Sequence, residues 1–248
     1  MQYIVFDLEF NQDAPSLRIF DRPKKLCSFE IIQIGALKLD EKFHTIETFN
    51  RYIKPTFYGQ ISPFVAELTG ITTKQLESEP PFPEVYRDFI NFIGSTDTLF
   101  CVWGLMDMKE LFKNALSHEL DINLLPKHYI NIQPYTSLHF HLPIKKLLRL
   151  ELAVSMLHIP MAHPFHNALH DAYYTAEIFK KVYRPSHMPS IQYDPFYKPA
   201  RPSQPKKKIN FQKLIQQFEK MYERAMTPEE VAMIKLAYQM GKTHQFLE

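Results

Sequence analysis

Residues 3–10 of this chain read YIVFDLEF, an apolar, β-branched and aromatic run that carries two carboxylates. The run predicts a central strand of a sheet. Asp7 and Glu9 stand two residues apart, so on a strand both side chains leave the same face. Burying two adjacent carboxylates is costly unless a cation neutralises them, and oxygen ligands at this spacing suit Mg²⁺ or Mn²⁺. The alternative is that the pair lies at a solvent-exposed end of the sheet.

Outward from this strand, the hydrophobic pattern predicts a mixed α/β fold. Further strands are expected at residues 30–39, 48–53, 98–103 and 129–133. Apolar residues at helical spacing predict helices at residues 82–93, from about 105, at 144–158 and at 168–183. The first three strands follow one another closely, as in an antiparallel meander. We therefore expect a mixed five-stranded sheet flanked by helices, within the α/β class.

The composition is that of a globular protein. The chain has 248 residues, of which 45% are hydrophobic and 23% charged, which excludes a disordered chain, a collagen-like repeat and a disulfide scaffold. Cys27 and Cys101 lack zinc-site spacing and indicate reduced thiols in a cytoplasmic protein. The N-terminus lacks the features of an export signal, and no apolar run is long enough to predict a membrane span. A formal net charge of +2 does not by itself identify a nucleic-acid-binding protein.

Two further acids and a histidine stand beside predicted elements. The segment HNALHD, residues 166–171, places Asp171 on the early turns of a helix and His166 in the approach to it. Histidine can accept a proton near neutral pH. Asp107 follows the strand that ends near Trp103. Each has an ordinary alternative: a chance pair in a chain with 11 histidines, or an early-helix acid favoured by the macrodipole.

Three motifs together resemble a known family. FDLEF (6–10), WGLMDMKEL (103–111) and HNALHDA (166–172) follow the order and spacing of the DEDDh class of 3′-to-5′ exonucleases, which have a ribonuclease H-like fold. FEIIQIGAL (29–37) and ISPFVAELTGIT (61–72) resemble the second strand and substrate-side helix of its Eri-like, KapD-like branch. The resemblance covers residues 1–183. Many relatives have threonine directly after the glutamate of the first motif, where this chain has Phe10 and then Asn11.

The resemblance implies an enzyme that removes nucleoside 5′-monophosphates from the free 3′ end of single-stranded RNA or DNA. Two Mg²⁺ (or Mn²⁺) ions about 3.5–4 Å apart would assist the attacking water and the leaving oxygen. The implied metal ligands are Asp7, bridging both ions, with Glu9 and Asp171 on one ion and Asp107 on the other. His166 is the implied general base.

A terminal-nucleotide pocket is implied as well. Its residues are Leu8, Phe10, Leu68, Thr69, Gly70, Ile71 and Trp103. Residues 68–71 are also explained by a helix C-terminus capped by Gly70. Glu30 lies near the site on this topology, and we leave it outside the metal ligands because a strand-edge role explains it equally well. The alternative functions are a non-catalytic nucleic-acid-binding or metal-stabilised interaction module, and an endonuclease of the ribonuclease H type.

The predicted catalytic domain spans residues 1–183 and includes a long loop at residues 11–29. This loop carries four basic residues and is either a solvated loop or a contact to the nucleic-acid backbone. Residues 184–210 hold six prolines and six Lys or Arg against Asp194 alone, which predicts a Pro-rich basic linker, or a segment that binds a single strand. Residues 211–248 predict a helical hairpin whose second helix opens with a capping box at residues 227–230.

Overall fold

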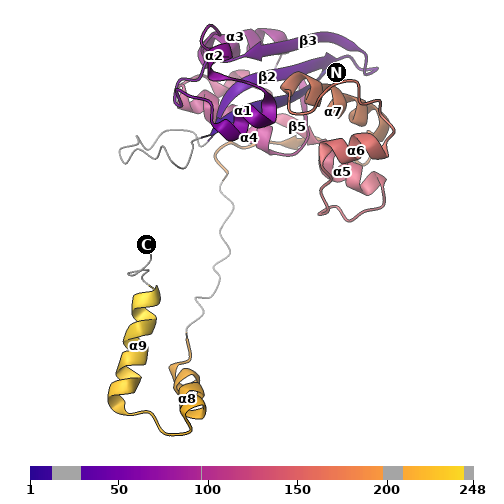
Figure 1. Ribbon diagram of the computed structural model, residues 1–248. Coiled ribbons are helices and arrows are strands. Elements are labelled where there is room, and N and C mark those ends of the chain that lie inside the picture. The colour runs from indigo at the N-terminus through magenta and orange to yellow at the C-terminus, as the bar shows by residue number, and fades with distance from the viewer. Residues whose placement is uncertain (13–28, 96, 198–208, 243–248) are drawn as a thin grey trace. The chain divides into compact units, whose positions relative to one another are not determined.

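The structure is a computed structural model that describes residues 1–12, 29–95, 97–197 and 209–242 (Figure 1). The chain divides into two compact units, Met1–Tyr197 and Lys198–Glu248. The predicted basic loop lies mostly in residues 13–28, outside the described residues, as does Cys27. None of the helices in the described part of the chain combines the length and apolar character needed to cross a bilayer.

A mixed six-stranded sheet forms the centre of the first unit, in the order β3-β2-β1-β4-β5-β6. The strands are β1 (Tyr3–Gln12), β2 (Phe29–Leu39), β3 (Thr45–Tyr52), β4 (Leu99–Val102), β5 (His128–Asn131) and β6 (Ile191–Gln192). The first three are antiparallel neighbours, as predicted, and β4 and β5 run parallel to β1. The sixth strand was not predicted, because two residues at the sheet edge leave no recognisable pattern in the sequence.

Seven α-helices surround this sheet within the described residues. They are α1 (Pro63–Thr69), α2 (Thr73–Leu76), α3 (Phe82–Ile93), α4 (Met106–Ser117), α5 (Ile132–His139), α6 (Leu150–Met156) and α7 (Ala168–Val182). The predicted helix at residues 144–158 was wrong in extent, because residues 143–149 form a loop and α6 begins only at Leu150. The predicted strand 129–133 stops at Asn131, whose side-chain oxygen accepts the Gln133 N–H and starts α5.

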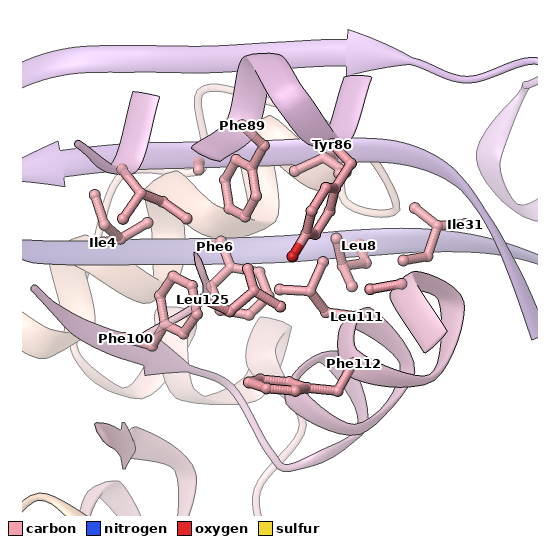
Figure 2. Close-up of a cluster of buried hydrophobic side chains, with 14 of the residues drawn as sticks. Ile4, Phe6, Leu8, Ile31, Tyr86, Phe89, Phe100, Leu111, Phe112 and Leu125 are labelled. Atoms are coloured by element: carbon pink, nitrogen blue, oxygen red, sulfur yellow. The ribbon is translucent and has the colours of Figure 1, made fainter. Parts of the chain in front are cut away.

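Side chains of β1 alternate between two hydrophobic clusters. Phe6 and Leu8 pack on the side of the sheet that meets α3 and α4 (Figure 2). Tyr3 and Val5 pack on the opposite side, in the cluster that includes α7. Because a strand alternates with a period of two, Asp7 and Glu9 share the face of Tyr3 and Val5. The two acids of the first motif therefore face α7.

The end of β1 anchors helix α1. A bulge in the pairing of β1 with β2 leaves Ile32 without a partner on β1, and its side chain packs beneath α1. Asn11 accepts the N–H of Ser62 at 3.0 Å and donates to the carbonyl of Gln60 at 2.9 Å. Ser62 in turn caps α1. Asn11, one residue past the predicted departure from the first motif at Phe10, thus fixes the start of α1.

The first unit continues past the predicted boundary at Tyr183. Met188 is buried, and the Tyr193 N–H donates to the Lys127 carbonyl at 2.7 Å while its ring packs on Phe112. Residues 184–197 of the predicted linker therefore belong to the first unit, in which β6 pairs with the edge strand β5. Residues 198–208, with most of the linker's lysines and arginines, lie outside the described residues.

The second unit is a helical hairpin of α8 (Phe211–Tyr222) and α9 (Pro228–Lys242). The rings of Phe211 and Tyr238 meet at 5.4 Å across the two helices. The predicted capping box is present: Thr227 Oγ1 accepts the Glu230 N–H, and the Glu230 carboxylate accepts the Thr227 N–H.

Candidate metal centre

Acidic side chains from three distant segments meet at one end of the sheet. Asp7 and Glu9 of β1 and Asp171 of α7 each offer a carboxylate oxygen, and these oxygens all lie within 4.8 Å of one another. Asp107 lies in the first turn of α4, which follows β4, the parallel neighbour of β1. Because parallel strands end at the same edge of a sheet, Asp107 lies next to this group. Its carboxyl group is buried, and its charge repels that of Asp7.

The surroundings of the four carboxyl groups raise their pKa values. Burial, followed by the charges of Asp107, Asp171 and Glu9, raises the pKa of Asp7 well above its usual value. Burial and the same repulsion raise the pKa of Glu9 to about 8.

The pKa values of the other two acids are raised as well. Burial is the largest cause of the shift at Asp107 and raises its pKa to about 8, although hydrogen bonds from backbone N–H groups lower it. Burial raises the pKa of Asp171 to about 6, against a hydrogen bond from the His166 backbone. Ionising all four acids at neutral pH therefore requires a compensating positive charge.

A divalent cation fits this set of donors. Asp171 Oδ2 accepts the His166 N–H at 3.1 Å, whereas Asp171 Oδ1 is buried and has no hydrogen-bond partner among the described residues. No Lys or Arg of the described chain forms an ion pair with the four carboxylates. Hard carboxylate oxygens are the ligands that Mg²⁺ and Mn²⁺ prefer. Such an ion would bind the partnerless Asp171 Oδ1 together with the two neighbouring carboxylates.

His166 lies beside this group of carboxylates, because its backbone N–H donates to Asp171. Its side chain is exposed, and its backbone has φ of 62°, in the left-handed region that non-glycine residues seldom adopt. Such conformations gather at functional sites. Asn167 follows as the cap of α7, accepting the N–H groups of Leu169 and His170. The backbone of His166 is thus tied to Asp171 while its imidazole faces solvent.

The residues predicted to bind the terminal nucleotide have mixed environments. Leu68 is exposed at the end of α1, and Gly70 caps that helix in the left-handed conformation with its N–H bonded to the Ala66 carbonyl. The capping interpretation of this segment is therefore correct. Thr69 Oγ1 accepts the N–H of Ile71, which is buried.

The other three predicted pocket residues lie on or beside β1 and β4. The side chain of Leu8 is buried on the face opposite the carboxylates, so its backbone alone is near them. Phe10 is half-buried and its ring packs on Phe29 at 6.0 Å. Trp103 is half-buried against the cluster that includes α7, and its Nε1 has no partner within the described residues.

Glu30 has a structural role. Its buried carboxylate accepts the backbone N–H groups of Thr56, Phe57 and Tyr58, which fixes the loop that leads to α1. These hydrogen bonds lower the pKa of Glu30, although burial, the larger effect, raises it. The structure thus explains Glu30 without a metal.

Two polar residues that the sequence did not single out hold the acidic segments in place. Gln33 Oε1 accepts the N–H of Ala168, the first residue of α7, and its Nε2 donates to Asn50. Asn131 Oδ1 accepts the N–H of Gly104 at 3.0 Å, in the turn that leads to Asp107. Asn131 lies inside the predicted strand 129–133 but is the last residue of β5 and the N-cap of α5. An asparagine at the point where a strand pattern ends is the signal by which this cap could have been found.

Comparison with known families agrees with this geometry. The family RNase_T, described as "Exonuclease", matches residues 4–179. The chain therefore belongs to this exonuclease family, as predicted.

Individual relatives are more distant. The chain is 25% identical over 200 residues to "ERI1 exoribonuclease 3" of Homo sapiens, which covers 74% of this chain and 57% of that protein. It thus spans little more than half the length of this curated relative. It is 27% identical over 92 residues to "Probable 3'-5' exonuclease KapD" of Bacillus subtilis, covering 37% of this chain and 44% of that protein.

Solved structures share the fold. The nuclease domain of 3'hExo, described as a DEDDh family member bound to rAMP, matches with a TM-score of 0.61 at 22% identity and covers 73% of this chain and 90% of that chain. This likeness confirms the predicted ribonuclease H-like fold, with one strand more than expected.

Proposed function

We propose that this chain is a metal-dependent 3′-to-5′ exonuclease that hydrolyses single-stranded RNA or DNA to nucleoside 5′-monophosphates. The observation that carries the proposal is a cluster of four carboxylates from three segments: half-buried Asp7 and buried Glu9, Asp107 and Asp171, whose Oδ1 has no hydrogen-bond partner among the described residues. Membership of the exonuclease family supports it, as do relatives named exoribonucleases. The substrate is nucleic acid with a free 3′ end.

Asp7, Glu9 and Asp171, with Asp107, would hold two Mg²⁺ or Mn²⁺ ions. Asp7 is the bridging candidate, because the other three acids all act on its carboxyl group. When bound, the cations would stabilise the charge that develops on the phosphodiester and lower the pKa of a water molecule. Gln33 and Asn131 keep α7 and the turn before α4 in place, so the four acids do not have to be ordered when the cations arrive.

His166 would act as the general base that takes a proton from the attacking water. Its backbone N–H is bonded to Asp171, so the residue stays at the metal centre. Its exposed imidazole can face the substrate and then release the proton to solvent. The end of α1, with Leu68, Thr69 and Gly70, would contact the terminal nucleotide through the exposed apolar side chain of Leu68.

We also propose a cytoplasmic location. The buried Cys101 is a free thiol, which agrees with a reducing compartment.

The experiment compares hydrolysis and metal binding in three proteins: the wild type, Asp7→Asn, and Asp88→Asn as a control. Asp88 is an exposed acid on α3. Wild type and Asp88→Asn should bind Mn²⁺ in a calorimetric titration and shorten single-stranded RNA or DNA. Asp7→Asn should lose both properties and keep the circular dichroism spectrum of the fold. Mn²⁺ binding by a wild type that hydrolyses neither strand would instead identify a metal-stabilised module without turnover.

A further inference from the structure

A charged surface lies between the second and third acidic motifs. We name residues 132–156, from α5 through α6, the α5–α6 lobe. It carries Lys145, Lys146 and Arg149 against a single acid, Glu151, whereas the whole chain is nearly balanced, with 29 basic and 27 acidic residues. All three cations are exposed, and within the described residues none of them forms a salt bridge.

Apolar side chains stand exposed among these cations. They are Leu138, Ile144, Leu147 and Leu152, each between 45% and 55% exposed. Single strands bind to surfaces that pair their phosphates with cations and cover their bases with apolar or aromatic groups. An acidic protein surface would also match the cations, but it would not explain why the lobe is connected to the metal centre.

The loop that carries the cations is ordered by side-chain hydrogen bonds. Ser137 Oγ donates to the carbonyl of Lys146 at 2.6 Å, and Gln133 Nε2 donates to the carbonyl of Leu148 at 2.8 Å. The side chain of Leu148 is buried in the core. The backbone beneath the cations is therefore held in place before any ligand binds, which reduces the entropic cost of binding.

Gln133 also connects the lobe to the metal centre. Its Oε1 lies 3.4 Å from the position that a Cβ on Gly104 would occupy, while its Nε2 is bonded to Leu148. One glutamine side chain thus spans the gap between Gly104, in the turn before Asp107, and the residue before Arg149. On the other side, α5 and α6 pack against α7, the helix that carries Asp171 (Figure 1).

We propose that the α5–α6 lobe binds the single strand upstream of its 3′-terminal nucleotide, with Lys145, Lys146 and Arg149 contacting phosphates. The inference rests on the proposed exonuclease function and extends it by naming the surface along which the substrate runs. A strand whose 3′ end lies at the carboxylates leaves the site past the turn at Gly104 and meets Arg149 first. We expect a dinucleotide to end before Arg149, and therefore before the two lysines.

The test neutralises the three cations together, as Lys145→Gln, Lys146→Gln and Arg149→Gln. The matched control neutralises two lysines and one arginine elsewhere: Lys42 in the β2–β3 turn, Arg87 on α3 and Lys181 at the far end of α7, all exposed. Binding of a labelled single-stranded decanucleotide is measured by fluorescence anisotropy over a salt series without divalent metal. Hydrolysis of the decanucleotide and of a dinucleotide is measured with Mn²⁺.

The lobe variant should bind the decanucleotide more weakly, and its slope of log affinity against log salt should be shallower by about 2, since each phosphate contact on a single strand contributes about 0.7. Its KM for the decanucleotide should rise while dinucleotide hydrolysis stays at the wild-type rate. A slope equal to that of the control variant would overturn the proposal and leave the lobe as a surface for another protein. If the wild type binds the decanucleotide with a steeper salt slope than the lobe variant but hydrolyses nothing, the proposal for the lobe stands and the exonuclease function is contradicted.

Discussion

Gly35 of β2 and Ala168, the first residue of α7, are in direct backbone contact. A Cβ on Gly35 would lie 2.1 Å from the carbonyl carbon of Ala168, closer than any real Cβ approaches another atom. Gly35 is also the pairing partner of Asp7 on β1. The start of α7 therefore lies directly on the sheet beside the acids of the first motif, and Asp171, in the first turn of α7, reaches them.

Gly35→Ala should displace the start of α7 and weaken both the fold and metal binding. Overpacking a core costs about 1–3 kcal/mol, and about 1 kcal/mol shifts the unfolding midpoint by about 2–4 °C in a domain of this size. Thermal unfolding and Mn²⁺ titration measure the two effects. Gly59→Ala is the matched control, because a Cβ there meets nothing within 4 Å. Equal midpoints and Mn²⁺ affinities in the two variants would show that the contact does not position Asp171.

The stability of the metal-free protein should fall as pH rises from about 4 to about 8. The folded-state pKa values of Glu9 and Asp107, about 8, and of Asp171, about 6, exceed the ordinary values of 4.5 and 3.8. The folded state thus binds more protons than the unfolded state in this range, and deprotonation favours unfolding. Unfolding midpoints in a chelating buffer measure the decline.

Removing one of these acids should flatten that pH dependence. Glu9→Gln eliminates one raised pKa and relieves repulsion of Asp7, so the metal-free variant should be more stable than wild type near pH 8. Saturating Mn²⁺ should stabilise wild type strongly at that pH and the variant much less. Midpoints of metal-free wild type that rise between pH 4 and pH 8 would mean that the carboxylates are not held close together.

Glu30→Gln should lower stability without affecting the metal. The Glu30 carboxylate satisfies three backbone N–H groups, and an amide offers fewer acceptor sites, which leaves a buried donor unpaired at about 1–3 kcal/mol. Chemical denaturation measures the loss, and Mn²⁺ affinity should stay at the wild-type value. A Mn²⁺ affinity lowered as far as in Glu9→Gln would place Glu30 among the metal ligands.

His166→Asn should lower turnover by about 10²–10⁴, the range for a lost general base, while Mn²⁺ affinity stays near the wild-type value. Asparagine tolerates the left-handed backbone that this position requires, so the fold is kept. His158→Asn is the matched control, since His158 is also exposed and has φ of 52°. Loss of Mn²⁺ binding in His166→Asn would make the imidazole a metal ligand instead.

Much of this site could be predicted from the sequence, because strand alternation and motif spacing carry the information. The period of two puts Asp7 and Glu9 on one face, and the start of a helix puts Asp171 on its early turns. The resemblance of the three motifs to the DEDDh class is what joined the four acids and the histidine into one predicted site, and their roles remain predictions.

The rest depends on tertiary contacts that leave little local pattern. Nothing in the sequence indicates that Gln33 accepts the N–H of Ala168, 135 residues away, or that Ile191 and Gln192 add an edge strand. Helix α5 was missed because the capping Asn131 was read as part of a strand. Glu30 could not be separated from the metal ligands until the loop at residues 56–58 was placed against it.

The measurement that tests the central claim most directly is a time course on single-stranded RNA and DNA labelled at the 3′ or the 5′ end, with a circular single strand alongside, in Mg²⁺ or Mn²⁺. The account predicts that a 3′ label appears at once as a mononucleotide, that a 5′-labelled strand shortens stepwise, and that the circle stays intact. Cleavage of the circular strand, or release of the 5′ label first, would contradict it.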